Sequence, residues 1–239
     1  MLTNYEIKIV SIEGNIGSGK STLLENLKKH YSNTNTNIIF LREPVDDWEN
    51  IKDSEGNSML KKFYENQEKY SFPFQMMAYI SRLKILRDCI EDINSKNNVN
   101  NLYNINNTYV IITERSLYTD KHVFAKMLHD QGKIEDVCYQ IYLKWFDEFT
   151  KEFPIDHSIY VNTTPKICYE RIHKRAREGE ELIPLNYLQE CHNYHEEFVN
   201  NVYTNKLILD GNVDIYNDPN IVNEWLQKIN KTIINAIVD

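Results

Sequence analysis

The sequence predicts an α/β fold: a five-stranded parallel sheet with helices on both faces. Short apolar runs of strand length alternate with longer segments of helical period along the chain, and such alternation is typical of βαβ units. A glycine-rich sequence lies directly between the first strand and the first helix. Phosphate-binding loops occupy this position in parallel α/β folds.

The expected elements fill one domain, residues 1–239. The expected strands are Ile7–Ile12, Ile38–Leu41, Tyr109–Thr113, Ser158–Asn162 and Leu207–Leu209. The expected helices are Ser21–Tyr31, Ser58–Asp92, Leu117–Phe153, Lys166–Arg177, Tyr187–Tyr203 and Pro219–Val238. Residues 94–107 contain eight asparagines in fourteen positions, which predicts a polar surface loop.

Composition excludes several classes of protein. The net charge of −8 argues against a nucleic-acid polymer as partner, because phosphate-backbone binding needs a basic face. No apolar run approaches the ~18 residues of a membrane span. The N-terminal MLTNYEIKIVSIEG has no signal or transit pattern, and the four cysteines form no C-x-x-C pair. We therefore expect a cytoplasmic enzyme with reduced cysteines.

The strongest motif is G-x-x-x-x-G-K-[ST], a phosphate-binding P-loop. Its residues are Gly14, Asn15, Ile16, Gly17, Ser18, Gly19, Lys20 and Ser21, followed by Thr22. Glycines let successive backbone N–H groups face one anion, and the following helix points its positive end there. Lys20 is expected to contact the β- and γ-phosphates, and Ser21 to ligate Mg²⁺. The motif predicts binding of ATP or another NTP.

Two further strand ends carry charged residues. Glu43 follows the second strand and precedes Pro44, so it is expected near the transferred phosphoryl group as a general base. An ordinary surface carboxylate is the alternative. Glu114 and Arg115 follow the third strand; an acidic group there can bind the Mg²⁺ shell, and an arginine can bridge donor and acceptor.

Five motifs occur in order between about residues 7 and 216: E-G-N-I-G-S-G-K-S-T, E-P-V-D-D-W, S-F-P-F-Q, E-R-S-L-Y-T-D and R-I-H-K-R-A-R. Together they resemble the deoxyribonucleoside kinases of the deoxycytidine and deoxyguanosine kinase type. The resemblance implies a P-loop kinase fold and transfer of the ATP γ-phosphoryl group to a deoxynucleoside 5′-hydroxyl, in nucleotide salvage. It also implies that Glu43 is the general base, that Arg115 steadies this hydroxyl, and that Glu114 belongs to the magnesium shell.

The resemblance also implies an acceptor pocket. Gln75 matches the base-reading glutamine, and Tyr64 and Glu196 match the residues that bind the sugar 3′-hydroxyl. Trp48 and Phe124 are expected to wall the pocket, with Phe124 stacking on the base. Core packing is the alternative for Tyr64, Trp48 and Phe124.

Arg82 and Asp120 match the two charged positions that meet the far edge of the base. Because buried charges are costly unless they are paired, we expect these two to form an ion pair beneath the base. Such an edge suits deoxyguanosine, deoxyadenosine or deoxycytidine better than thymidine. The choice among the three stays open, with a lean to purines because Ala78 keeps that wall small.

Arg171, Arg175 and Arg177 match an arginine-rich lid, expected at about residues 171–184. Cations there would stabilise the transferring phosphoryl group; a solvated basic helix end is the alternative. Arg171 and Arg175 share one helix face, whereas Arg177 joins them only if the helix ends and folds over. The acidic residues after the lid helix are expected to be solvated. Asp214 lies in the segment that matches the donor-base loop.

The resemblance further implies a homodimer through a helix bundle, which the segment Leu117–Phe153 is long enough to supply. Two other functions stay open: a nucleoside monophosphate kinase of the thymidylate kinase sort, and a non-catalytic nucleotide-sensing protein. A monophosphate acceptor would meet repulsion from Glu43 and Glu196. The complete set of catalytic residues argues against a sensor.

Overall fold

The sheet is five-stranded and entirely parallel, in the order β2-β3-β1-β4-β5. The computed structural model describes residues 5–33, 37–99, 107–215 and 219–238. The strands are β1 (Tyr5–Glu13), β2 (Ile38–Leu41), β3 (Asn107–Glu114), β4 (His157–Asn162) and β5 (Lys206–Asp210). All five predicted strands are confirmed, each in its expected place in the chain.

Strand β1 lies at the centre of the sheet, between β3 and β4, with Ile9 opposite Ile111 and Val10 opposite His157. Alternate residues of β1 and β3 pack into different clusters: Val10 joins one core, and Ile9 and Ile111 join another. A parallel sheet buried on both faces requires such continuous apolar strands.

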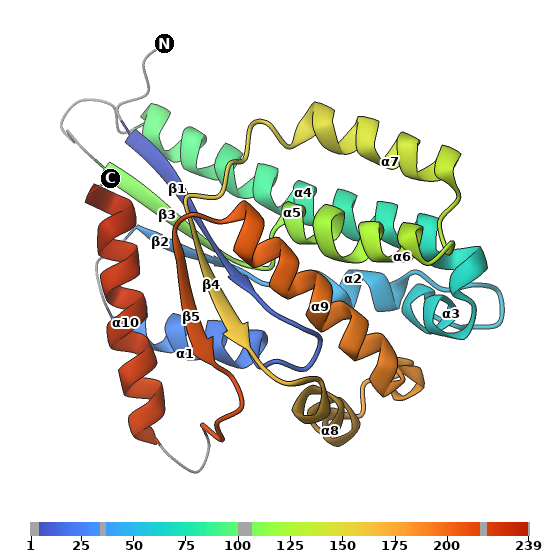
Figure 1. Ribbon diagram of the computed structural model, residues 1–239. Helices are drawn as coiled ribbons and strands as arrows, with labels where there is room; N and C mark the ends of the chain where they lie inside the picture. Colours follow the sequence, from blue (N-terminus) through green and yellow to red (C-terminus); the bar gives the residue numbers. More distant parts are fainter. Residues whose placement is uncertain (1–4, 34–36, 100–106, 216–218, 239) are drawn as a thin grey trace.

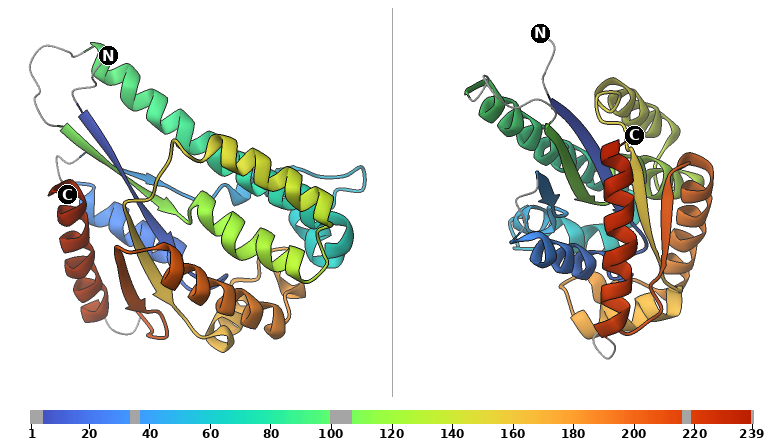
Figure 2. Two further views of the ribbon diagram at one scale, coloured as in Figure 1. Left: turned by 45° about the horizontal axis from the view of Figure 1, so that its top comes forward. Right: turned by 90° about the vertical axis from the view of Figure 1, so that its left-hand side faces the viewer.

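Helices cover both faces of this sheet (Figure 1). Helices α1 (Lys20–Tyr31) and α10 (Pro219–Val238) pack on one face, through Leu27 and Ile229 among others. Helices α4 (Gln67–Val99) and α7 (Asp136–Phe149) pack on the other, through Tyr79 and Phe146. The left view in Figure 2 shows the sheet between the two helix layers, with α4 and α7 on one side and α1 and α10 on the other. The predicted α/β architecture is confirmed.

The predicted helix Ser58–Asp92 is in fact two helices, α3 (Met59–Glu65) and α4. Asn66 breaks them apart, because its backbone leaves the helical region (φ −148°, ψ 84°) and its side chain accepts a hydrogen bond from the Lys69 N–H. Helix α4 also continues to Val99, so residues 94–99 are helical rather than loop. Residue 107 begins β3, and residues 100–106 lie outside the described residues.

The predicted helix Leu117–Phe153 is also divided. It comprises α5 (Leu117–Thr119), the π-helix η1 (Asp120–Ala125), α6 (Lys126–Asp130) and α7. Gly132, at φ 69°, turns the chain between α6 and α7, a conformation that glycine adopts without strain. A short helix that the sequence did not predict, α2 (Val45–Asn50), follows β2.

The remaining elements surround the carboxyl ends of the strands. They are α8 (Pro165–Arg175), the 3₁₀ helix η2 (Glu180–Leu182) and α9 (Leu185–Val202). Because all strands are parallel, the loops that follow β1, β2, β3 and β4 meet at one edge, where ligands of such sheets bind. None of the helices in the described ranges is long and apolar enough to cross a membrane.

Candidate active site

A cavity of about 890 Å³ opens at the carboxyl edge of the sheet. Its lining comes from the P-loop, the end of β2, helices α3 and α4, the β3–α5 turn, the α8–η2 segment and the loop after β5. Nearly every residue that the sequence singled out lies in this wall. The cavity is large enough for two small ligands, because ligand pockets commonly measure about 300–1,000 Å³.

The P-loop forms the donor end of the cavity, and residues Ile16 to Thr22 line it. Gly17 has φ 77°, and a Cβ there would lie 2.6 Å from the Cys168 carbonyl oxygen, so only glycine fits. Gly14 and Asn15 do not line the cavity. They support the loop instead, since the Asn15 amide donates to the Leu188 carbonyl at 2.8 Å.

Lys20 begins α1 and is 4% exposed. Its ammonium Nζ donates to the Asn15 carbonyl oxygen at 2.7 Å. Burial, with the charge of Arg115 second, lowers the pKa of Lys20 to about 7. An anion at the P-loop would reverse this shift, because an opposite charge favours the protonated form.

Ser21 and Glu114 meet beside the P-loop, where the Ser21 hydroxyl donates to Glu114 Oε1. The other carboxylate oxygen, Oε2, lies 3.4 Å from the Glu43 backbone nitrogen. A hydroxyl oxygen and a carboxylate side by side suit Mg²⁺, which prefers oxygen ligands. The two predicted magnesium ligands therefore lie together.

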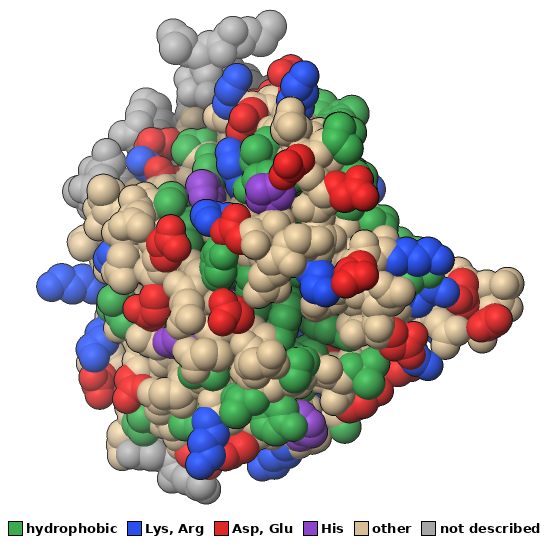
Figure 3. Space-filling view, turned by 45° about the vertical axis from the view of Figure 1, so that its right-hand side comes forward, with side chains coloured by type: hydrophobic (Ala, Val, Ile, Leu, Met, Phe, Trp, Pro, Cys, Tyr) green, Lys and Arg blue, Asp and Glu red, His purple; other side chains and the backbone are tan. Residues whose placement is uncertain are grey.

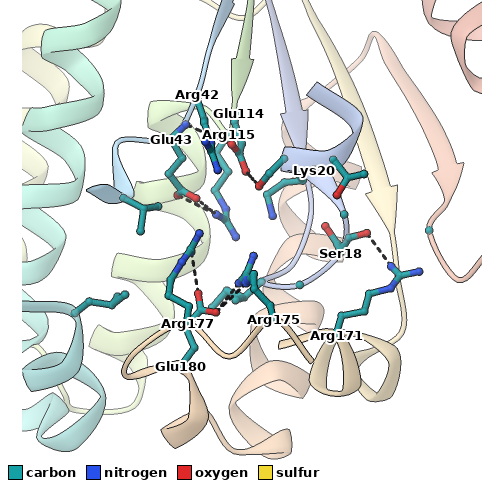
Figure 4. A pocket seen from close by; sticks show the side chains of 18 of the residues that line it. Ser18, Lys20, Arg42, Glu43, Glu114, Arg115, Arg171, Arg175, Arg177 and Glu180 are labelled. Atoms are coloured by element: carbon teal, nitrogen blue, oxygen red, sulfur yellow. Dashed lines mark hydrogen bonds and ion pairs between the residues drawn. The ribbon is translucent and has the colours of Figure 1, made fainter. Parts of the chain in front are cut away.

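Glu43 lies between two arginines, of which Arg115 is labelled in Figure 4. Arg115 Nη1 donates to both Glu43 carboxylate oxygens at 2.9 Å, and Arg82 Nη2 donates to Oε1 at 3.0 Å. Burial acts to raise the pKa of the Glu43 carboxyl, but Arg115, Arg82 and Lys20 together hold it at about 2. Glu43 is therefore an ionised carboxylate inside the cavity rather than a surface group.

The far end of the cavity contains the predicted ion pair. Arg82 Nε donates to Asp120 Oδ2 at 3.0 Å, and Nη2 lies 3.3 Å from Oδ1. Arg82 also donates to the Glu114 carbonyl at 3.0 Å. Burial raises the pKa of Asp120, and Arg82 opposes that rise. The Arg82–Asp120 pairing is confirmed.

Four other predicted acceptor residues line the same end: Trp48, Tyr64, Gln75 and Phe124. Gln75 is 2% exposed, and its Oε1 has no hydrogen-bond partner within the described residues. A buried acceptor without a partner is costly, so this atom is suited to a ligand donor. The Phe124 ring lies 5.1 Å from the Arg115 guanidinium, and Trp48 Nε1 donates to Ser81 Oγ at 2.8 Å.

Glu196 does not line the cavity, contrary to the prediction. It lies on α9 beside Tyr160, and it contributes, after burial, to raising the pKa of that phenol. A carboxylate that the sequence did not single out, Glu180, lies in the wall at 3% exposed, and its charge acts, after burial, to raise the pKa of Tyr64. Glu180 follows the third lid arginine, Arg177, by three residues; this spacing was the available signal.

The three lid arginines lie in the cavity wall but have different partners (Figure 4). Arg171 donates to the Ser18 carbonyl at 3.1 Å and to the Val213 carbonyl at 3.0 Å. Arg175 Nη2 and Arg177 Nη1 bind opposite oxygens of Glu180, at 2.6 and 3.0 Å. Glu180 is therefore not solvated, contrary to the expectation for the acidic run.

Helix α8 ends at Arg175, and Ala176 takes a left-handed conformation (φ 53°, ψ 45°). This turn folds the chain back, so that Arg177 joins Arg175 at Glu180. The sequence analysis expected Arg177 to join the lid only if the helix ended and folded over, and the chain has this geometry.

The loop after β5 closes the donor end. Gly211, Asn212, Val213, Asp214 and Ile215 line the cavity together with Trp225 of α10. Trp225 and Arg42 are among the lining residues that were not predicted. Arg42 immediately precedes Glu43, and charged residues at a strand's carboxyl end were the signal that could have revealed it.

A P-loop lysine, a hydroxyl–carboxylate pair and an ionised carboxylate clamped by arginines, at the carboxyl edge of a parallel sheet, define a P-loop phosphotransferase. The chain matches the family model for deoxynucleoside kinase over residues 10–235. It therefore belongs to the deoxynucleoside kinase family, and it is an ATP-dependent kinase that phosphorylates a nucleoside hydroxyl.

Relatives within the family are named for different nucleosides. A probable deoxycytidine kinase of fowlpox virus (strain NVSL) is 36% identical over 230 residues, covering 93% of this chain and 86% of the viral protein. Deoxycytidine kinase 2 of Gallus gallus is 34% identical over 238 residues, covering 89% and 85%. The mitochondrial deoxyguanosine kinase of Xenopus laevis is 31% identical over 208 residues, covering 81% and 74%.

Proposed function

We propose that the enzyme transfers the γ-phosphoryl group of ATP to the 5′-hydroxyl of deoxyguanosine, deoxyadenosine or deoxycytidine, in preference to thymidine. The observation that carries the proposal is the position of Glu43. It lies in one cavity with the P-loop and is held by both Arg115 and Arg82. Salvage of deoxynucleosides is the metabolic role of such a reaction.

In the proposed mechanism Glu43 accepts the proton of the 5′-hydroxyl as the oxygen attacks the γ-phosphorus. The new O–P bond forms while the bond to the β,γ-bridging oxygen breaks, and ADP leaves. Arg115, which already contacts both Glu43 oxygens, orients the carboxylate and the alcohol. Lys20 and the lid arginines offset the charge that spreads over the transferring group.

Magnesium is the metal that we propose for the donor, held by Ser21 and Glu114. It supplies neutralisation of phosphate charge. ATP or a similar NTP enters along the P-loop, with its base towards Asp214 and its neighbours in the loop after β5. Groups of three or more His, Cys, Asp or Glu able to hold another metal do not occur within the described ranges.

The base preference rests on Arg82, Asp120 and Gln75. Asp120 accepts from the exocyclic amine of cytosine or adenine, and Arg82 donates to O6 of guanine. The Gln75 amide, with its unpartnered oxygen, reads the other edge of the base. Thymine offers this edge a methyl and a carbonyl. Ala78 lies in the wall and leaves room for a purine.

For the sugar 3′-hydroxyl we propose Tyr64 and Glu180. Both line the cavity, and they replace the pair Tyr64 and Glu196 that the resemblance implied. Oε2 of Glu180 accepts from both Nε and Nη2 of Arg175, whereas Oε1 accepts from Nη1 of Arg177. Oε1 therefore keeps a lone pair for a sugar donor.

The other two functions receive less support. A monophosphate acceptor would place its 5′-phosphate beside Glu43, an ionised carboxylate that would repel it. A sensor would not need an ionised general base. The test is to incubate the protein with Mg·ATP and each of the four deoxynucleosides or their monophosphates, and to measure kcat/KM. Phosphorylation of monophosphates alone, or thymidine as the best acceptor, would contradict the proposal.

A homodimer through α4 and α7 is proposed from an exposed apolar stripe. Val137, Ile141 and Trp145 recur every four residues on α7 and are 61%, 43% and 50% exposed. Ile80 of the neighbouring α4 is 51% exposed. Analytical ultracentrifugation should give twice the mass of one chain. The helix available is α7 rather than the whole segment Leu117–Phe153.

The remaining proposals concern partners and compartment. We propose small molecules as the ligands, and no nucleic-acid polymer, because acidic and basic side chains are interspersed on the face in Figure 3. A cytoplasmic location is supported by four free cysteines, which suit a reducing compartment. Imaging of a tagged protein would test it.

A further inference from the structure

Arg115 has a strained backbone that needs support. Its φ is 63°, in the left-handed region that non-glycine residues seldom adopt. Such a conformation persists only where the surroundings enforce it. Part of the enforcement comes from β1 and the segment after it: the Arg115 N–H donates to the Ile12 carbonyl at 2.9 Å, and Nη2 lies 3.4 Å from the Gly14 carbonyl oxygen.

Glu13, the residue between these two carbonyls, is 0% exposed. Its carboxylate accepts hydrogen bonds from the Thr119 hydroxyl and, at 3.0 Å, from the Tyr203 hydroxyl. Within the described part of the chain Glu13 forms no ion pair. Neither the proposed substrate binding nor the proposed phosphoryl transfer uses this buried carboxyl group. Burying a carboxyl group costs free energy unless hydrogen bonds offset that cost. Thr119 and Tyr203 supply these hydrogen bonds.

These hydrogen bonds converge on the turn that carries Arg115. Ser116 accepts from the Thr119 N–H at 3.2 Å, and its hydroxyl lies 3.0 Å from the Tyr203 hydroxyl and 3.1 Å from that of Thr119. Because the Tyr203 proton is used on Glu13, Ser116 donates to Tyr203. The cluster therefore ties together the end of β1, the start of α5 and the residue that follows α9.

We propose that Glu13 is a positioning residue, whose buried carboxylate acts through Thr119 and Tyr203 to hold the turn so that Arg115 faces Glu43. The segment Ile12–Gly14 then holds the turn on both sides: its carbonyls contact Arg115, and the Glu13 carboxylate contacts Thr119 directly and Ser116 through Tyr203. Glu13 touches no substrate. It acts on the reaction only through Arg115, so this inference rests on the proposed role of Arg115.

The first experiment is a double-mutant cycle. Glu13→Gln keeps the shape but replaces one accepting oxygen by a donor, and it should lower kcat by about tenfold or more while the nucleoside KM changes less than about threefold. In an Arg115→Lys background the same substitution should change kcat by less than about threefold, because coupled residues are not additive. Equal losses in both backgrounds would overturn the proposal.

Milder variants guard against a misfolded Glu13→Gln protein. Tyr203→Phe and Thr119→Val each remove one hydroxyl that donates to Glu13, and each should lower kcat in the same direction. Tyr142→Phe is the matched control, since that buried hydroxyl has no hydrogen-bond partner within the described residues; its kcat should equal the wild-type value. Loss of activity in the control, or none in Tyr203→Phe, would contradict the inference.

A crystal structure tests the positioning role of Glu13 without a measurement of turnover. The result therefore holds even if deoxynucleosides are not the acceptors. In Glu13→Gln or Tyr203→Phe, Arg115 should leave the left-handed region or lose its contacts with Glu43. An Arg115 unmoved in both variants would refute the positioning role and leave the proposed kinase reaction standing. Failure of the wild-type protein to phosphorylate any deoxynucleoside would instead refute the proposed function.

Discussion

The donor and acceptor ends of the cavity are built in different ways. The donor end is mostly one continuous stretch, Ile16–Thr22, with backbone groups fixed by tight turns. The acceptor end is assembled from side chains of α2, α3, α4, η1 and η2, and opposite charges hold it together. The first end depends on local geometry, and the second depends on how distant segments pack. Substitutions at the two ends should therefore fail differently.

The largest effect is expected where the two ends meet, at Glu43. Glu43→Gln should lower kcat by about 10²–10⁴, the scale of general-base catalysis, while nucleoside affinity stays nearly intact. Single-turnover kinetics and direct nucleoside binding measure the two quantities. Asp47→Asn, at an exposed carboxylate of α2, is the control with the same change of charge. Retained turnover in Glu43→Gln would assign the base to another residue.

The next prediction distinguishes Glu180 from Glu196 as the carboxylate that binds the sugar. Glu180→Gln should lower kcat/KM for the deoxynucleoside by about 10- to 150-fold, because hydrogen bonds to charged groups contribute about 1.5–3 kcal/mol. Glu196→Gln, a matched control outside the cavity, should stay within about threefold of wild type. The reverse ranking would restore Glu196 to the acceptor site.

The Arg82–Asp120 pair should control base choice and stability together. Arg82→Met with Asp120→Ala should raise kcat/KM for thymidine relative to deoxyguanosine by about tenfold. Arg82→Met alone leaves Asp120 buried without its partner, so it should destabilise the fold by about 3–5 kcal/mol, and more than the double substitution does. Urea denaturation measures the second part. No gain for thymidine would remove the pair from base recognition.

The smallest effect tests the donor end by pH. In the protein without ATP, Lys20 has a pKa of about 7, so its side chain is mostly neutral at pH 8. Bound phosphates should raise that pKa. ATP binding at pH 8 should therefore take up a fraction of a proton, and affinity should weaken as pH rises above 7. Calorimetry in buffers of different ionisation enthalpy measures the uptake. Lys20→Met should abolish the proton uptake. Uptake that persists in this variant would show that another group takes up the proton.

Features formed by one continuous stretch of sequence could be predicted, whereas features that join separate segments were mostly missed. The five strands and the P-loop were foreseen because each is a single local pattern, and the Arg82–Asp120 pair because two charges at matching positions need each other. The position of Glu180 was missed because it depends on the left-handed turn at Ala176, and alanine has no preference for such turns. The breaks at Asn66 and Gly132 had local signals, a capping side chain and a glycine, that the long helical patterns obscured.

The attachment of α8 has a mechanical consequence. Gly17 packs against the Cys168 carbonyl, and Arg171 ties Ser18 to Val213, so the helix, the P-loop and the donor-base loop move as one body. We expect the lid to bend at Ala176, directly after α8, rather than at the start of that helix. Such a movement would carry Arg177 and Glu180 away from Arg175, while the contact between Arg171 and Ser18 stays unchanged.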